Sequence, residues 1–335
     1  MRGVRSTLGG TENCVRRPAV QPTTTVRPPV TAVAPFGRAV EVGEGVHAYL
    51  QPPGGWCLNN AGIIVSGGKS ALVDTTATEA RARHLRSTAL ELNPAAPRAV
   101  VTTHFHGDHA FGNFVFPEAV VIGHERTRTE MMAAGLHLTG LWPDVVWGGI
   151  ELAPPTVTYR DRLTLHVGTI RAELEHTGPA HTSNDTVVWL PGQRVLFTGD
   201  LVMNGVTPFC LMGSIAGSLA ALGRLRAFGA TTVVPGHGPV GGPETFDAVE
   251  GYLRLVQRLA QEGLRAGLTP IQTARGAHLG RYADLLDPER LAPNLRRAYA
   301  ELEGLPADAP LPMSERQAAL GEMIEFNGGP PCCLA

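Results

Sequence analysis

Residues 101–113, VTTHFHGDHAFGN, concentrate four potential metal ligands within six positions: His104, His106, Asp108 and His109. Imidazole nitrogens and carboxylate oxygens are donors that divalent zinc prefers. Residues 99–102, AVVT, read as a buried β-strand that leads into this loop. The fold must therefore deliver the loop at the edge of a sheet. A polar loop with chance histidines is the alternative, but four donors at these spacings are hard to reach by accident.

The spacing within the loop divides the four donors into two pairs. Residues two apart in an extended segment point to the same side, so His104 and His106 can bind one ion. Gly107 lets the chain turn, and Asp108 and His109 can then face a second ion. We expect a helix to begin near Ala110 and to carry the ligand cluster at its N-terminal end.

Three further donors each follow a predicted strand and lie in a turn. His181 lies in GPAHTSND, Asp200 ends VLFTGD, and His237 lies in VVPGHGPV. Strand ends meet at one edge of a sheet, so these three side chains can join the first loop. Each would be weak evidence alone, but together with the loop they predict a site for two metal ions.

The rest of the chain alternates strand and helix patterns. A hairpin over residues 61–76 turns at Gly67 and Gly68 and ends in Asp74. Further elements are expected at these ranges: helices 78–92 and 124–135, a long loop 136–155, strands 119–123, 163–167, 170–176, 186–190 and 194–198, a helix from Ser214, and a last strand with its exit loop at 231–240. Residues 244–328 look almost wholly helical, with an apolar stripe at Tyr252, Leu255, Val256 and Leu259. We therefore predict a core over 36–243 and a helical part, 244–335, packed on it.

Composition excludes several classes of protein. The net charge of −2 gives no hint of nucleic-acid binding, and no apolar run approaches 18 residues, so no membrane span is expected. Residues 1–35 are rich in arginine and proline and have no apolar signal segment. They are expected to form a disordered arm, with a functional basic arm as the alternative. The five cysteines are irregularly spaced, which favours a reduced, cytoplasmic protein in which Cys57 and Cys210 are buried rather than nucleophilic.

The order of the seven donors, H-x-H-x-D-H followed by His, Asp and His, resembles the metallo-β-lactamase fold superfamily over about residues 40–240. The resemblance implies an α/β fold, the αββα sandwich, with two zinc ions at one edge. It implies His104, His106 and His181 on the first zinc, Asp108, His109 and His237 on the second, and Asp200 between them. Asp74 matches an acidic residue that supports the metal loop from behind the ligands.

Asp200 separates branches of this superfamily. Glyoxalase II-like thioesterases and lactonases carry an aspartate at this place, whereas the true β-lactamases usually lack it. Destruction of β-lactams is therefore disfavoured. The extra domains and nucleic-acid surfaces of RNA-processing relatives are not found in the sequence.

Several other segments are similar to the second-ring cyclase/thioesterases of aromatic polyketide pathways, the actinorhodin type. They are residues 53–63, 140–155, 159–168 and 205–209 and the end FNGGPPCCLA. The resemblance implies a polyketide substrate bound to an acyl carrier protein. It further implies ring closure by aldol condensation and release by thioester hydrolysis, with Asp108 and Asp200 as the catalytic carboxylates. A thioesterase or lactonase for small metabolites remains the alternative. A metal-binding protein without catalysis fits less well, and the oligomeric state stays open.

Four large side chains in loops could border the metal site: Trp56, Trp142, Phe209 and Met212. Ordinary packing is an equal alternative for each of them. Seven histidines outside the motif are expected to be surface or core residues rather than ligands: His47, His84, His124, His137, His166, His176 and His278.

Overall fold

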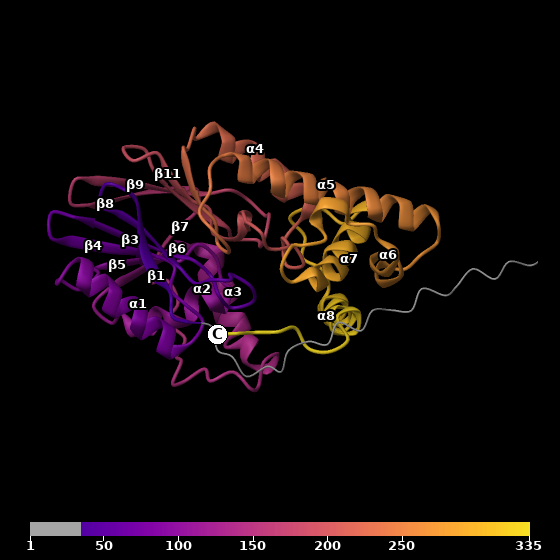
Figure 1. The fold of residues 1–335 in the computed structure, drawn as a ribbon, viewed down its shortest axis with the longest axis horizontal. Coiled ribbons are helices and arrows are strands. Elements are labelled where there is room, and N and C mark those ends of the chain that lie inside the picture. The colour runs from indigo at the N-terminus through magenta and orange to yellow at the C-terminus, as the bar shows by residue number, and fades with distance from the viewer. Residues whose placement is uncertain (1–34) are drawn as a thin grey trace, which may run out of the picture. The chain divides into compact units, whose positions relative to one another are not determined.

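Two β-sheets face each other, and helices cover their outer faces (Figure 1). The structure is a computed structural model that describes residues 35–335. The predicted arm, residues 1–35, lies outside this part of the chain except for its last residue. The αββα arrangement expected from the sequence is confirmed.

The first sheet has seven strands that pair in sequence order. Its first four strands are antiparallel, and the last three join in parallel. The strands are β1 (Arg38–Gly43), β2 (Val46–Leu50), β3 (Ala61–Ser66), β4 (Lys69–Val73), β5 (Ala99–Val101), β6 (Val120–His124) and β7 (Val157–Tyr159).

The second sheet has five strands in the order β12-β11-β10-β9-β8. The β11–β12 pair is parallel and the other pairs are antiparallel. The strands are β8 (Arg162–Val167), β9 (Ile170–His176), β10 (Thr186–Leu190), β11 (Val195–Phe197) and β12 (Thr232–Val234).

Eight α-helices and five short 3-10 helices complete the described part. The α-helices are α1 (Glu79–Leu92), α2 (Gly107–Ala110), α3 (Glu125–Ala134), α4 (Ile215–Ala227), α5 (Glu244–Arg265), α6 (Pro270–Gly276), α7 (Leu291–Leu302) and α8 (Met313–Asn327). The 3-10 helices are η1 (Phe111–Val115), η2 (His137–Gly140), η3 (Gly199–Leu201), η4 (Gly280–Tyr282) and η5 (Pro288–Arg290).

Three apolar layers hold this arrangement together, because each sheet buries both of its faces. Side chains of both sheets, such as Ile64 and Leu174, meet in the layer between them. The outer face of the first sheet packs on α1 through residues such as Leu85. The outer face of the second sheet packs on α4, α5 and α7 in one continuous cluster. The helical segment that follows Pro243 therefore shares a core with the second sheet.

Local signals place most helix ends where the sequence suggested. The Thr78 side chain caps α1, and α3 ends at Gly135, which has φ +57°. Tyr252, Leu255 and Val256 on α5 are buried, so the predicted stripe does face the core. Residues 244–328 are helical except in their connecting loops.

Two local features differ from the predictions. The helix expected near Ala110 begins earlier, at Gly107, so Asp108 and His109 lie inside α2, and η1 follows from Phe111. The strand β7 was missed, since its three residues carry too little pattern beside the long loop before it. Among residues 35–335, no helix is long and apolar enough to cross a bilayer.

Candidate metal centre

The metal-binding motif lies where the parallel strands of the first sheet end. After β5, Thr102 still donates its backbone N–H to Ile122 of the neighbouring strand β6, at 2.8 Å. The next residues leave the sheet, and His106 occupies the N-cap position of α2 without a capping hydrogen bond from its side chain. This extended entry followed by a tight turn places four donor side chains within one loop, and all four are buried.

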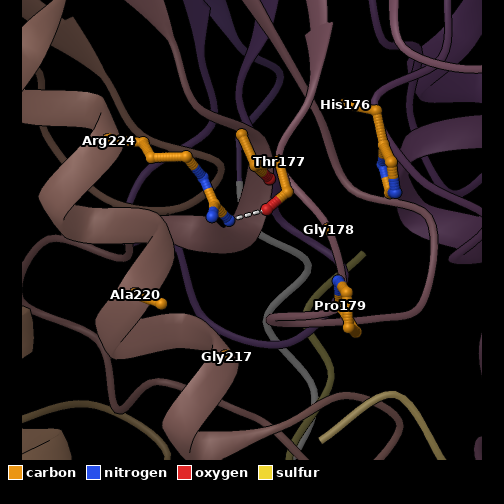
Figure 2. A pocket seen from close by; sticks show the side chains of 7 residues that line it. All are labelled: His176, Thr177, Gly178, Pro179, Gly217, Ala220 and Arg224. Atoms are coloured by element: carbon orange, nitrogen blue, oxygen red, sulfur yellow. Dashed lines mark hydrogen bonds between the residues drawn. The ribbon is translucent and has the colours of Figure 1, made fainter.

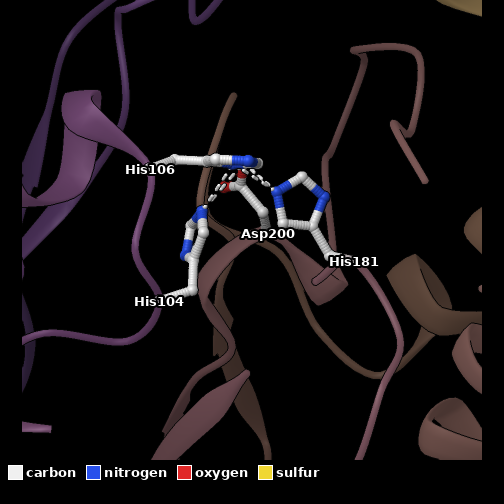
Figure 3. A group of neighbouring side chains, drawn as sticks. All are labelled: His104, His106, His181 and Asp200. Atoms are coloured by element: carbon white, nitrogen blue, oxygen red, sulfur yellow. Dashed lines mark hydrogen bonds and ion pairs between the residues drawn. The ribbon is translucent and has the colours of Figure 1, made fainter. Parts of the chain in front are cut away.

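The first cluster of donors contains His104, His106, His181 and Asp200 (Figure 3). Its ligand atoms all lie within 4.8 Å of one another. His106 Nδ1 lies 3.1 Å from His104 Nε2 and 2.9 Å from His181 Nε2. Three ring nitrogens that converge in this way can share one cation.

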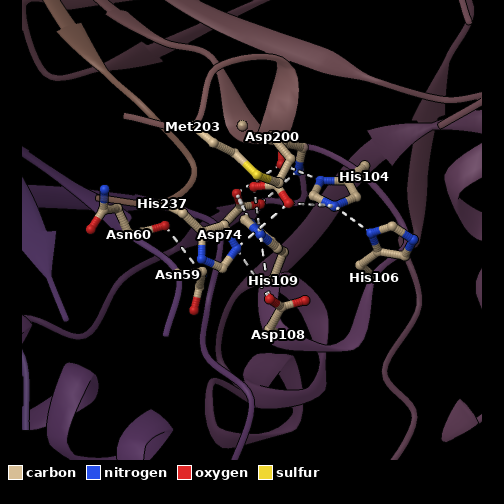
Figure 4. A network of polar contacts seen from close by, with 12 residues as sticks. Asn59, Asn60, Asp74, His104, His106, Asp108, His109, Asp200, Met203 and His237 are labelled. Atoms are coloured by element: carbon tan, nitrogen blue, oxygen red, sulfur yellow. Dashed lines mark hydrogen bonds and ion pairs between the residues drawn. The ribbon is translucent and has the colours of Figure 1, made fainter. Parts of the chain in front are cut away.

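The second cluster contains Asp108, His109 and His237 (Figure 4). His237 Nε2 lies 3.3 Å from Asp108 Oδ2. Asp200 reaches this cluster too, with Oδ1 at 3.1 Å from His109 Nε2 and Oδ2 at 3.5 Å from His237 Nε2. Since Asp200 Oδ2 is also 3.4 Å from His181 Nε2, this carboxylate lies between the two clusters.

The outer nitrogen of four histidines is held by a second partner. His181 Nδ1 donates to the Phe209 carbonyl at 2.5 Å, and His237 Nδ1 donates to the Gly54 carbonyl at 2.9 Å. His109 Nδ1 lies 2.8 Å from Asp74 Oδ2, and His104 Nδ1 lies 3.1 Å from the Thr103 hydroxyl. An imidazole that donates from Nδ1 presents an unprotonated Nε2, which is the form that binds a metal. These contacts therefore aim four nitrogens inward.

Asp74 supports the metal-binding loop from behind the donors, as the sequence suggested. Its carboxylate accepts from the Thr103 N–H and hydroxyl, both at 2.7 Å, and it faces His109. The residue has φ +60°, so the chain leaves β4 by a turn that directs the side chain under the loop. Asp74 thus fixes the loop without reaching the centre of either cluster.

Other polar side chains fix the two loops that carry His181 and His237. Asp185 accepts from the N–H and hydroxyl of Thr182, at 2.8 and 2.7 Å, which closes the loop after His181. Asn60 donates its side-chain amide to the carbonyls of Pro235 and Gly238, at 2.9 and 2.7 Å, and so holds the loop around His237.

Gly236 precedes His237 at a point of close approach. A Cβ atom at Gly236 would lie 1.9 Å from Asp200 Oδ1, so no larger residue fits without displacing that carboxylate.

Burial and mutual charge divide the histidines into two groups. Burial lowers the pKa of His104, His106 and His181, and neighbouring histidines lower the pKa of His104 and His106 further. Burial also opposes the charged form of His109 and His237, but the nearby carboxylates outweigh it. They raise the pKa of His109 well above its usual range and the pKa of His237 to about 9.

The carboxylates respond in the opposite sense. Burial opposes the ionised forms of Asp108 and Asp200, but the histidine charges outweigh it and lower the pKa of both. Both carboxylates therefore stay ionised at neutral pH, which is the form that binds a metal.

Two buried atoms indicate that the donor set fits a metal. His109 Nε2 and Asp200 Oδ1 lie 3.1 Å apart as an ion pair, but neither makes a hydrogen bond within residues 35–335, although both are shielded from water. Buried polar atoms are almost always satisfied, so such a pair calls for a missing partner. A divalent cation would satisfy both atoms. The histidine nitrogens and aspartate oxygens of the two clusters are donors of the type that zinc accepts.

A cavity of about 180 Å³ adjoins both clusters. The four side chains proposed from the sequence, Trp56, Trp142, Phe209 and Met212, all line it. The Trp56 ring packs against the rings of Trp142 and Phe209, each at 5.4 Å between centroids. The cavity thus joins an aromatic wall to the candidate metal centre.

Several residues of the cavity were missed by the sequence reasoning. His137 lines it and packs beside His106, with 6.2 Å between the ring centroids. Arg290 and Leu320 come from the C-terminal helical segment, and the Arg290 guanidinium lies 3.9 Å from the centre of the Trp56 ring. No motif marks these positions, because they depend on how distant segments pack. The other six histidines expected to be ordinary residues belong to neither donor cluster in residues 35–335.

A larger surface pocket, of about 370 Å³, lies away from the donor clusters (Figure 2). Its wall is formed by the loop after β9 and by α4, and includes His176, Pro179 and Arg224. The Arg224 guanidinium donates to the Thr177 carbonyl and so ties the two walls together. The pocket has neither cluster of donors, and we assign the chemistry to the smaller cavity.

Comparisons with known proteins agree with this geometry. The chain is 26% identical over 306 residues to a linear primary-alkylsulfatase of Pseudomonas sp. (strain ATCC 19151), covering 77% of this chain but 54%, about half, of that protein. It is 24% identical over 218 residues to the metallo-beta-lactamase type 2 of Bacteroides fragilis, covering 62% of this chain and 81% of that protein.

A solved structure and a family model give the same assignment. The metallo-beta-lactamase from Pontibacter korlensis superimposes with a TM-score of 0.55 at 21% identity, covering 65% of this chain and 99% of that one, which supports the fold. The family model of the metallo-beta-lactamase superfamily matches residues 54–237, which hold all seven donors. The chain therefore belongs to the metallo-beta-lactamase superfamily, whose members are hydrolases with a metal-binding cluster of histidines and aspartates.

Proposed function

We propose that this chain binds two zinc ions and acts as a cyclase/thioesterase on an aromatic polyketide carried by an acyl carrier protein. The observation that carries the proposal is the aromatic cavity that opens directly onto two donor clusters sharing Asp200. Hydrolysis belongs to the superfamily, while ring closure and the carrier-bound substrate rest on the sequence resemblance and on the flat, apolar walls.

Zinc bound at such clusters lowers the pKa of a coordinated water and polarises a carbonyl oxygen. Side chains of this protein would bind the substrate and exclude water. The aromatic rings of Trp56, Trp142 and Phe209 offer flat surfaces on which a first-formed ring can stack. The apolar wall excludes bulk water, which strengthens electrostatic interactions inside the cavity.

Asp108 is the carboxylate best placed for proton transfer in this proposal. It lines the cavity, and its Oδ2 is held by His237 at 3.3 Å. A carboxylate in this position can accept the acidic proton between two carbonyl groups of a polyketide chain. Asp200 is held among three histidines and would instead position both ions.

The experiment combines metal analysis with product analysis. Protein purified without chelator should contain close to two zinc ions per chain, and a value of zero, or iron alone, would contradict the zinc proposal. The metal-loaded protein should convert a short-thiol mimic of a once-cyclised polyketide into a two-ring product and a free acid. Free acid alone, with no second ring, would restrict the function to hydrolysis.

A thioesterase or lactonase for a small metabolite is the second candidate. The size of the cavity favours it, because about 180 Å³ is less than the ~300 Å³ at which pockets for larger ligands usually begin. The two candidates differ in substrate range. A small-metabolite enzyme should cleave short acyl thioesters or lactones at about 10 per second. It should show no turnover of the polyketide mimic.

A further inference from the structure

Two buried cysteines, Cys57 and Cys333, pack in one apolar cluster beside the cavity. Cys57 lies in the loop between β2 and β3, lines the cavity and is 1% exposed. Cys333 lies in the segment after α8 and is 8% exposed. Both side chains belong to one buried apolar cluster with Trp142. The two thiols lie close enough for each to shift the pKa of the other. Neither is part of a disulfide within residues 35–335.

The segment that carries Cys333 is anchored on both sides of the thiol. Trp142 Nε1 donates to the Pro331 carbonyl at 2.8 Å. The Arg81 guanidinium donates to the Leu334 carbonyl at 3.0 Å. These two contacts hold Cys333 at Cys57 although the residues are far apart in the sequence. Figure 1 shows this yellow segment running from α8 back toward the first sheet.

We propose that Cys57 and Cys333 form a reversible disulfide when the protein meets a peroxide or a low-molecular-weight disulfide. Each thiol loses its hydrogen, and one S–S bond forms between the two sulfurs. The two electrons and two protons reduce hydrogen peroxide to two waters, an organic hydroperoxide to one alcohol and one water, or a small disulfide to two thiols. A small oxidant reaches Cys57 through the cavity that this side chain lines.

The bond links the C-terminal segment covalently to the aromatic wall. Cys57 follows Trp56, whose ring packs against Trp142, and Trp142 already holds Pro331. In the oxidised protein these residues are fixed as one unit, and in the reduced protein only hydrogen bonds and packing hold them. This modification site is a property of the two thiols and does not depend on the reaction catalysed at the metal centre.

The test uses the full chain with its metal. Protein is treated with hydrogen peroxide or with oxidised glutathione, its remaining thiols are counted under denaturing conditions, and its peptides are mapped without reductant. We expect two thiols to be lost together, a single crosslinked peptide pair joining Cys57 to Cys333, and full recovery with reductant. The melting temperature of the oxidised form should rise by about 2–5 °C, because the crosslink constrains the unfolded chain.

Neighbouring cysteines supply the controls. Cys332→Ser changes the adjacent residue and should still form the crosslink, as should Cys14→Ser. Cys333→Ser and Cys57→Ser should each abolish it. If Cys57→Ser fails to fold, because it places a hydroxyl at a site that is 1% exposed, the comparison of Cys333→Ser with Cys332→Ser decides alone.

Three results would overturn the proposal. One is the retention of all thiols in the treated wild-type protein. The second is a crosslink that survives in Cys333→Ser but disappears in Cys332→Ser. The third is the addition of oxygen to Cys57 in place of a crosslink.

Discussion

His109 Nδ1 hydrogen-bonds to Asp74 Oδ2 across 2.8 Å in the interior of the protein. Both residues are at most 2% exposed. The same contact fixes the other end of the ring, because His109 Nε2 then lies 3.1 Å from Asp200 Oδ1. A carboxylate outside the donor clusters thus sets the direction of a donor inside them.

Asp74→Asn should therefore weaken metal binding without unfolding the protein. Asparagine keeps the shape and tolerates the positive φ of this position, but it removes the charge that orients His109. Loss of such a supporting contact typically costs about 10–100-fold in metal affinity. Competition with a chelator of known affinity measures the change. Asp284→Asn, at an exposed site, is the matched control, and equal metal affinities in the two variants would contradict the role of Asp74.

The metal centre was predictable because its donors carry a local signal. Four of them share one loop, and His181, Asp200 and His237 each follow a strand whose apolar pattern is plain. Strand ends converge at one sheet edge, so the topology alone brings the seven side chains together. The αββα layers followed from the same alternation of strands and helices.

The cavity was predictable only in part. Its aromatic side chains stood out by type, but His137 and Arg290 have ordinary sequence surroundings, and nothing in the sequence pairs the C-terminal Cys333 with Cys57 beside the cavity. They reach the site through the packing of η2, of η5 and of the segment after α8, which are set by long-range contacts. The helix expected near Ala110 begins earlier, at Gly107, because Asp108 and His109 themselves take up its first turn.

Hydrolysis of β-lactams should be negligible. Asp200 stands between the two clusters, and three aromatic side chains, Trp56, Trp142 and Phe209, occupy much of the wall of the adjoining cavity. The measurement is turnover of a chromogenic cephalosporin by the zinc-loaded protein. Turnover at about 1–1000 per second, as is usual for an enzyme on its own substrate, would contradict this prediction.

Stability should fall as the pH drops below the ordinary pKa of histidine, partly through His124. This residue caps α3, where its Nδ1 accepts from the Arg126 N–H at 3.2 Å, and its ring stacks on His176 with 3.9 Å between centroids. Burial, His176 and Arg126 lower the pKa of His124 to about 4, against a weak opposing effect of Glu125. Between pH ~6.5 and ~4 the unfolded chain therefore binds more protons, and acid favours unfolding.

Melting curves of His124→Asn can test this contribution. Asparagine offers a capping oxygen in place of the imidazole Nδ1 and does not titrate in this range. The drop in melting temperature from pH 7 to pH 5 should be smaller in the variant than in the wild type. His166→Asn, which changes an exposed histidine on β8, serves as the control and should leave the drop unchanged. An equal drop in His124→Asn would contradict the assignment.

The last prediction separates the metal centre from the cavity. Asp200→Ala removes the carboxylate shared by both clusters, so ring closure and thioester cleavage should be lost together. Trp142→Ala should instead harm ring closure more than cleavage of a simple acyl thioester. Closure requires a nucleophilic carbon to meet a distant ketone, and a misplacement of about 1 Å can cost on the order of a hundredfold. Cleavage requires only that the carbonyl reach the metal centre.

Trp142 also contributes to folding, which the experiment must take into account. Its ring is 5% exposed and its Nε1 donates to Pro331, so Trp142→Ala should cost about 3–5 kcal/mol of stability. Trp142→Phe keeps most of the ring and serves as the milder companion variant. Both are assayed below their melting temperatures with the polyketide mimic and with a short acyl thioester. If both Trp142 variants lose the two activities equally, Trp142 supports the fold and does not position the substrate. If Asp200→Ala still closes the ring at full rate, the metal centre does not catalyse cyclisation.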